Sequence, residues 1–188
     1  MIASCPGLSS DSNVSMVLYS CKANVVFWAL FTNFEIMNAT AASPVSFFSE
    51  YPVTLRHRRL LKQFIVRLFH SEGKKLEHLN YIFCSDEKVL DINKTYLKHD
   101  YYTDIITFEL QPKGEPVQGD IFISVERVKD NAQQLAQTQT RELHRVIFHG
   151  ALHLCGYRDK TAKEEKLMRA KEDHYLDKYD KALRKEGK

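Results

Sequence analysis

The amino-acid sequence predicts an α+β fold, or an α/β sandwich, in which helices pack on a few strands. Three observations support this prediction. Before residue 70, apolar residues repeat at helical spacing, namely Leu61, Phe64, Ile65, Leu68 and Phe69. The runs HLNYIFC at 78–84 and TDIITFEL at 103–110 are rich in β-branched and aromatic residues, as strands are. The chain has 188 residues, 44% of them hydrophobic, which is enough for the core of one domain.

The first half of this domain is expected to contain two strands and two helices. A strand candidate, PVSFFSE, spans 44–50, and Thr54 can cap a helix that runs to about residue 70. The strand at 78–84 is followed by Ser85, which can open a second helix to about residue 96. Because no repeat or Pro- or Ser-rich linker follows residue 44, we expect one domain at residues 45–183.

The second half is expected to contain two strands and three helices. Gly114 and Pro116 mark a turn between the strand at 103–110 and a second one at 120–124, which indicates a hairpin or two neighbouring strands. A helix from Ser124 to about 135 and a longer one at about 140–154 follow. Thr161 and Glu164 can form a capping box for a last helix to about 183, which leaves 184–188 as a charged tail.

Residues 1–44 are interpreted as an N-terminal extension, with Met37 as an alternative translation start. Its apolar run, ANVVFWALF at 23–31, is well short of the roughly 20 residues that span a bilayer, so no membrane protein is expected. A secretory signal is disfavoured, although ATA at 39–41 has the form of a cleavage site, because Glu35 interrupts the approach to it. The four widely separated cysteines fit a reducing compartment, so we expect a cytoplasmic protein.

The segment FHGALHLCGYRDKT, at 148–161, concentrates residues that can bind a metal ion. His149 and His153 are four apart on a predicted helix, so both imidazoles lie on one face at a spacing that suits one zinc ion. Gly156 is expected to end the helix and turn the chain back, which brings Asp159 round as a third, oxygen ligand. Two surface histidines that happen to share a helical face are the competing interpretation.

Three protein ligands leave a coordination position for water, which is typical of catalytic rather than structural zinc. We therefore expect His149, His153 and Asp159 to form a catalytic metal site. The spacing is similar to the extended motif of the metzincin peptidases, which carry a glutamate as general base directly after the first histidine. That position is Gly150 here, so a zinc-dependent peptidase is the second interpretation. A phosphodiester substrate such as RNA relaxes the need for this base.

Positive charge is concentrated at residues 54–75, where seven basic residues accompany the single acidic residue Glu72. Within it, Arg56, Arg59 and Arg67 are predicted to share one side of a helix and to contact an RNA backbone; an ordinary solvated face is the alternative. Asp120 is a candidate to orient a ligand histidine through its outer nitrogen. His144 and Arg145 are expected to be surface residues. The other histidines have no partner at metal spacing and are expected to be structural, namely His57, His70, His78, His99 and His174.

Three blocks of the chain resemble the bacterial YbeY proteins. The first, INKTYLKHDYYTDIITF at 92–108, is similar to the family's L-N-x-x-Y-R-x-x-D-x-x-T-D-V-L-S-F. The second, GDIFISVERVKDNA at 119–132, is similar to its G-D-I-x-I-S segment and the helix that follows. The third, HGALHLCGYRD at 149–159, is similar to the signature H-G-x-L-H-L-x-G-Y-D-H. With the flanking helices, the resemblance covers about residues 45–183.

The resemblance implies a mixed sheet with a zincin-like metal helix. It also implies a single-strand-specific, metal-dependent endoribonuclease that matures the 3′ end of 16S ribosomal RNA and acts in late-stage quality control of the 70S ribosome. Zinc and the small ribosomal subunit are then the expected cofactor and partner. A non-catalytic ribosome- or RNA-binding factor with structural zinc is a further alternative.

The chain departs from the family pattern at two positions. Asp159 stands where the family has its third histidine ligand; an aspartate can also bind zinc, but its charge makes the metal a weaker Lewis acid and admits harder ions. Leu97 stands where the family has an arginine, and a leucine cannot contact a phosphate. Lys98, the next residue, is the candidate to replace it as a point charge.

Overall fold

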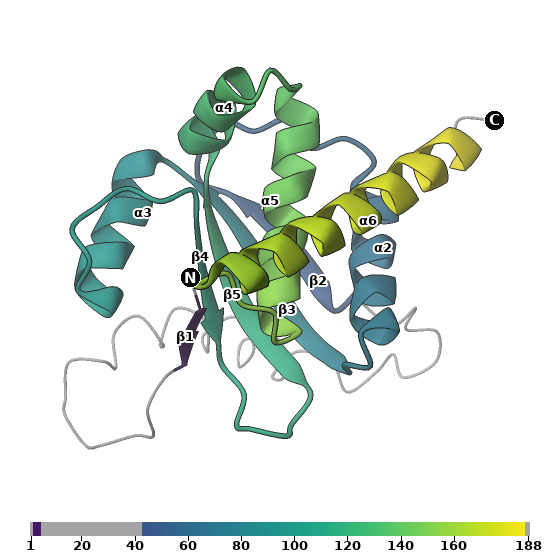
Figure 1. The fold of residues 1–188 in the computed structure, drawn as a ribbon, viewed down its shortest axis with the longest axis horizontal. Coiled ribbons are helices and arrows are strands. Elements are labelled where there is room, and N and C mark those ends of the chain that lie inside the picture. Colours follow the sequence, from purple (N-terminus) through teal and green to yellow (C-terminus); the bar gives the residue numbers. More distant parts are fainter. Residues whose placement is uncertain (1, 5–42, 187–188) are drawn as a thin grey trace, which may run out of the picture. The chain divides into compact units, whose positions relative to one another are not determined.

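The computed structural model describes residues 2–4 and 43–186, which build one mixed β-sheet with helices on both faces (Figure 1). The strands lie in the order β1-β4-β5-β3-β2. Their bounds are β1 Ile2–Ser4, β2 Val45–Ser49, β3 Leu76–Cys84, β4 Ile105–Glu109 and β5 Val117–Ser124. Only β4 and β5 pair antiparallel; the other neighbours are parallel. The predicted α+β fold is therefore confirmed.

Within the described residues, six helical segments connect and cover these strands. They are α2 Arg58–Ser71, α3 Asp86–Ile92, the π-helix η1 Asn93–Leu97, α4 Val125–Gln134, α5 Gln139–Leu154 and α6 Ala162–Glu186. The predicted helix starts at Ser85 and Ser124 are confirmed, since each hydroxyl accepts a hydrogen bond from the main-chain N–H three residues on. Thr161 and Glu164 form the predicted capping box. Because α6 continues to Glu186, the expected charged tail is helical as far as the structure describes it.

Successive side chains along a strand point to opposite faces of the sheet, so the core is divided into two clusters, one on each face. On β4, Ile105 packs into the larger cluster with α2, α5 and α6, whereas Ile106 packs into a smaller one with α3. Figure 1 shows α5 in front of the sheet, with α6 crossing it. Gly150 lets α5 approach closely, because a Cβ there would lie 2.8 Å from Cδ1 of Ile105 and 3.0 Å from Cδ1 of Ile121. This close packing fixes the end of α5 against the sheet.

The predicted start of the first helix, at Thr54, is wrong. Helix α2 begins at Arg58, after His57, whose φ of 50° is left-handed and incompatible with a continuing helix. Before it, residues 51–56 alternate between half-buried and exposed, and Tyr51, Val53 and Leu55 pack against the core. The segment is not helical, because its apolar residues have a period of two and a helix would turn some of them to solvent.

The N-terminal residues contribute one strand that the sequence did not predict. Strand β1 pairs with β4 in the register Ile2 to Thr107. The rest of the expected extension, including the apolar run, the cleavage-like site and Met37, lies outside the described residues. None of the helices that the structure describes is long and apolar enough to cross a membrane.

His144 and Arg145 are not the surface residues that the sequence predicted. They lie on α5 under α6 and are only 6% and 8% exposed. The His144 ring packs edge-on to Tyr179 with ring centroids 4.8 Å apart. Burial lowers the pKa of His144 to about 4, against the opposing effect of Asp180 and with smaller contributions from His57 and Arg141. The imidazole is thus neutral at pH 7.

This buried neutral histidine is expected to make the fold sensitive to acid. The unfolded chain binds a proton at His144 below about pH 6.5, whereas the folded chain does so only near pH 4. Stability should therefore fall as the pH drops from about 6.5 to 4, by at most about 1.4 kcal/mol per pH unit from this group. Urea unfolding at pH 7 and pH 5 measures the loss of unfolding free energy between the two pH values, and this loss should be smaller for His144→Phe than for the wild type. His174→Phe, at an exposed position, should leave the loss between pH 7 and pH 5 as in the wild type. If both variants reduce this loss equally, the acid sensitivity does not come from His144.

Candidate metal centre

Three side chains converge at the end of α5. Nε2 of His149 lies 3.6 Å and Nε2 of His153 lies 3.5 Å from the same carboxylate oxygen, Oδ2 of Asp159. The planes of the two imidazole rings are nearly perpendicular, and the ring centroids are 4.4 Å apart. The three potential ligand atoms all lie within 4.8 Å of one another. The structure thus brings together the three residues that the sequence singled out.

Local backbone geometry explains why this happens. The two histidines are one helical turn apart on α5, and Gly156 takes a φ of 103°, which ends the helix as predicted. The turn is closed by hydrogen bonds from the N–H of Gly156 to the His153 carbonyl and from the N–H of Tyr157 to the Leu152 carbonyl. The chain then runs back along the helix end and delivers Asp159.

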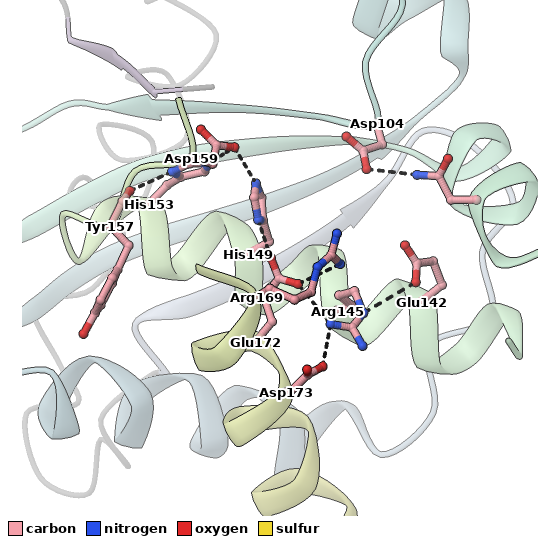
Figure 2. Close-up of polar contacts among 11 residues, drawn as sticks. Asp104, Glu142, Arg145, His149, His153, Tyr157, Asp159, Arg169, Glu172 and Asp173 are labelled. Carbon is pink, nitrogen blue, oxygen red and sulfur yellow. Dashed lines mark hydrogen bonds and ion pairs between the residues drawn. The ribbon is translucent and has the colours of Figure 1, made fainter. Parts of the chain in front are cut away.

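Hydrogen bonds at the outer nitrogens set the tautomer of both rings. Nδ1 of His153 lies 2.9 Å from the carbonyl oxygen of Tyr157, which can only accept, so Nδ1 carries the proton. Nδ1 of His149 lies 2.8 Å from Oε1 of Glu172 and donates to that carboxylate in the same way (Figure 2). Because Nδ1 of each ring donates to these acceptors, Nε2 is the nitrogen that each ring offers to a metal, and it is directed toward Asp159.

This arrangement fits a divalent cation. Nε2 of His153 is buried and has no hydrogen-bond partner among the described residues, although a buried polar atom normally has one. Burial, and then His149, lower the pKa of His153 to about 4, so the ring is neutral near pH 7. Nitrogen and oxygen ligands at tetrahedral zinc are about 3.4 Å apart, close to the separations found here. The side chain of Asp159 is 33% exposed, which leaves the site open to solvent on one side.

Glu172 on α6 is a residue of this centre that the sequence analysis missed. It is 3% exposed, and besides His149 its carboxylate accepts hydrogen bonds from Nη1 of Arg145 at 3.0 Å and Nη1 of Arg169 at 3.1 Å. Burial alone would raise the pKa of Glu172, but the bonds from His149 and Arg145 hold it below its ordinary value. The ionised carboxylate thus orients His149. A glutamate within the buried stripe of Met168, Glu172, Tyr175 and Tyr179 was the available signal.

Asp120 does not orient a ligand histidine, so that prediction is wrong. Its carboxylate accepts a hydrogen bond from Nδ2 of Asn80 at 2.9 Å, across neighbouring strands β5 and β3. Burial raises the pKa of Asp120. The residues that hold the outer nitrogens of the two histidines are instead Glu172 and the main chain of Tyr157.

A hollow of about 450 Å³ opens beside the centre and includes His149, Asp159, Leu97 and Lys160. None of the residues predicted to contact RNA is part of its lining. Lys98 is not part of its lining; it is exposed, and its ammonium group donates to the carbonyl of Thr95. Among the described residues, Lys160 is therefore the lysine at the hollow.

The three arginines predicted to contact RNA, Arg56, Arg59 and Arg67, are exposed, and none lines this hollow or the adjoining one at His149. They also do not share one helical face, because Arg56 precedes α2 while Arg59 and Arg67 lie on it. The three arginines thus do not contribute charge to the lining of the hollow.

Tyr157 is clamped by a carboxylate at the end of α2. Glu72 accepts a 2.7 Å hydrogen bond from the hydroxyl of Tyr157, another from the hydroxyl of Tyr175, and bonds at 2.9 and 3.1 Å from the ammonium of Lys171. Burial would raise the pKa of Glu72, but the bonds from Tyr175, Lys171 and Tyr157 lower it. Since the carbonyl of Tyr157 holds His153, Glu72 supports the metal centre from a distance.

Glu72→Ala is therefore expected to affect both stability and metal binding. It leaves three donors without their acceptor, at a cost of about 1.5–3 kcal/mol in unfolding free energy. Metal affinity should fall several-fold as the loop around Tyr157 loosens. Urea unfolding and competition with a chelating dye measure the two effects. Glu72→Gln, which keeps an acceptor oxygen, should recover most of the metal affinity; a Gln variant as weak as the Ala variant would argue against this support.

A mixed-sheet α+β protein with a cluster of two histidines and one carboxylate at a helix end belongs to the class that can hold a single metal ion. Residues 49–180 match the family described as Endoribonuclease YbeY, which is 132 of the 188 residues, and the chain belongs to this family.

Among curated relatives, the Endoribonuclease YbeY of Cytophaga hutchinsonii is 52% identical over 122 residues, which cover 65% of this chain and 85% of that protein. That of Bacteroides thetaiotaomicron is 47% identical over 119 residues, covering 63% and 86%. The solution structure of TM1509 from Thermotoga maritima is similar with a TM-score of 0.54 and 27% identity, over 76% of this chain and 93% of that one.

Proposed function

We propose that this protein is a metal-dependent endoribonuclease, a hydrolase that cleaves phosphodiester bonds in single-stranded RNA at the His149, His153 and Asp159 cluster. The observation that carries the proposal is the convergence of Nε2 of His149 and Nε2 of His153 on one carboxylate oxygen of Asp159, in a chain of the Endoribonuclease YbeY family. The named activity of the relatives supports RNA as the substrate.

In this proposal, His149, His153 and Asp159 hold one zinc ion. When bound, the metal supplies a Lewis acid and lowers the pKa of water, so that hydrolysis proceeds near neutral pH. The chain's own residues keep the site ready: Glu172 and the Tyr157 carbonyl hold the outer protons of the two rings, and Asp159 completes the ligand set from the open side. An aspartate in this set also accepts other divalent ions such as Mn²⁺.

The substrate in this proposal is ribosomal RNA of the small subunit. Its roles are maturation of the 3′ end of 16S RNA and late-stage quality control of the 70S ribosome, in the cytoplasm. Lys160 supplies positive charge at the hollow. The exposed Arg59 and Arg67 supply it on α2, where they can hold RNA at a distance from the cleaved bond.

The structure offers no support to the peptidase alternative at the position where metzincins have their base. Gly150 is buried, and the direction of its missing side chain is filled by Ile105 and Ile121 of the sheet. A residue at this position would therefore face the core and not the two imidazoles. RNA cleavage does not require a base there.

The test compares two substrates at one protein concentration. Protein loaded with zinc should cleave an unstructured RNA but not an unfolded protein, and should leave the same RNA intact when it is annealed to its complement. A chelator should abolish the cleavage and added zinc should restore it. Cleavage that survives metal removal, or that acts on the protein substrate instead, would overturn the proposal.

A further inference from the structure

We propose that the rings of His99 and Tyr101 form a platform on which one unpaired RNA base stacks next to the cleaved phosphate. This inference rests on the proposed function and names the part of the site that selects single strands. Both residues line the same hollow as His149 and Asp159. One end of that hollow is thus the metal centre, and another part of its wall is aromatic.

The two rings already form a stacked pair. Their planes are 22° apart and their centroids 5.2 Å apart, and the Tyr101 hydroxyl lies 3.2 Å from Nδ1 of His99. Tyr101 is 48% exposed, a large fraction for an aromatic side chain, and it lines the hollow. A base that joined this pair would extend an existing stack.

The chain between η1 and β4 holds the pair in place. Asn93 is completely buried, its Nδ2 donates a 2.8 Å hydrogen bond to the carbonyl of Tyr101, and its own carbonyl accepts one from the N–H of His99 at 3.2 Å. Between Asn93 and His99, Lys98 has a left-handed φ of 58°, which turns the chain. Because one buried residue anchors the main chain of both His99 and Tyr101, through its side chain and its own carbonyl, the platform exists before RNA binds.

The chemistry of such a platform suits an unpaired base and no particular sequence. Every base has a flat π-face, and stacking on an aromatic side chain contributes about 5- to 150-fold in affinity per base. Bases within a duplex are covered on both faces by their neighbours, so they cannot reach the platform. Lys160, on the wall of the same hollow, provides a positive charge for a phosphate of the same strand.

Two other tyrosines of the same segment provide matched controls. Tyr96 is 47% and Tyr102 is 49% exposed, nearly the same as Tyr101, but neither belongs to the lining of the hollow. Tyr96 packs edge-on to Phe108, and Tyr102 lies under the guanidinium of Arg127 at 4.7 Å. A general loss of exposed aromatic surface would therefore affect all three variants equally.

The first measurement is binding, which does not depend on turnover. A fluorescent 2′-O-methyl single-stranded oligonucleotide is titrated with the full-length protein in the presence of a chelator. Tyr101→Ala should raise Kd by about 10-fold, Tyr101→Phe should restore affinity because it keeps the ring, and Tyr96→Ala and Tyr102→Ala should change Kd less than about 2-fold. Thermal unfolding of each variant verifies that the fold is intact.

The second measurement uses cleavage of an RNA with one abasic nucleotide, placed in turn on each side of the cleaved bond. At one position, removal of the base should raise KM for the wild type but not for Tyr101→Ala, which locates the base on the platform. If the wild type cleaves RNA but Tyr101→Ala behaves like Tyr102→Ala in both assays, the platform is refuted while the proposed function stands. If zinc-loaded wild type cleaves no RNA, the proposed function itself fails.

Discussion

His153→Ala is expected to abolish metal binding and RNA cleavage together while the fold persists. His153 is 1% exposed at its side chain, and its Nε2 faces Asp159 without any other partner among the described residues. Its removal leaves one imidazole and one carboxylate, too few ligands for a stable zinc site. We expect metal affinity to fall more than about 100-fold, since loss of an outer hydrogen-bond partner alone costs up to that factor.

The measurements for this variant are metal content per chain, cleavage rate and the midpoint of thermal unfolding. The exposed His174 on α6 provides the control, and His174→Ala should keep all three. His149→Ala should lose metal in the same way but also lose more stability, because it removes a hydrogen bond from buried Glu172. A His153→Ala protein that keeps one metal ion and full cleavage would show that the centre lies elsewhere.

The metal cluster could be predicted from the sequence because its geometry is local. His149 and His153 are related by a single helical turn, and Gly156 reverses the chain within three residues. Asp159 then follows within the same short segment, so no packing between distant elements was needed to bring the three together. The same argument explains the correct helix caps at Ser85 and Ser124, which depend on residues three apart.

What the sequence analysis missed depends on contacts between distant segments. Glu172 reaches His149 only because α6 crosses α5. The sequence of α6 alone does not predict this crossing. The aromatic wall of the hollow depends on the anchoring of Tyr101 by Asn93, eight residues away, and on the approach of that segment to the end of α5. The misplaced start of α2 had another cause: Thr54 is of a residue type that caps helices and lies ahead of the apolar repeat, whereas the helix begins after His57.

Glu172→Ala is expected to weaken both the fold and the centre, and its effect can be separated from that of its neighbour on α6. Arg145 is buried and bound by both Glu172 at 3.0 Å and Asp173 at 2.8 Å, but the side chain of Glu172 is 5% exposed and that of Asp173 is 54%. Removing the buried partner Glu172 leaves the buried guanidinium of Arg145 without its buried counter-charge, which should lower the free energy of unfolding by about 3–5 kcal/mol. Removing the exposed partner by Asp173→Ala should cost less than about 1 kcal/mol.

The conservative variant separates charge from orientation. Glu172→Gln keeps an oxygen that can accept the proton of His149 Nδ1, so the ring stays oriented, but it removes the negative charge that increases the basicity of the imidazole. Metal affinity should fall about 10- to 100-fold in Glu172→Ala and less in Glu172→Gln, while Asp173→Ala binds metal like the wild type. Equal metal affinities in the Ala variants of Glu172 and Asp173 would mean that Glu172 serves only the packing of α5 against α6. Metal affinity that falls in the order Asp173→Ala, Glu172→Gln, Glu172→Ala would instead mean that the buried carboxylate of Glu172 on α6 is part of the metal centre, as are the ligands on α5.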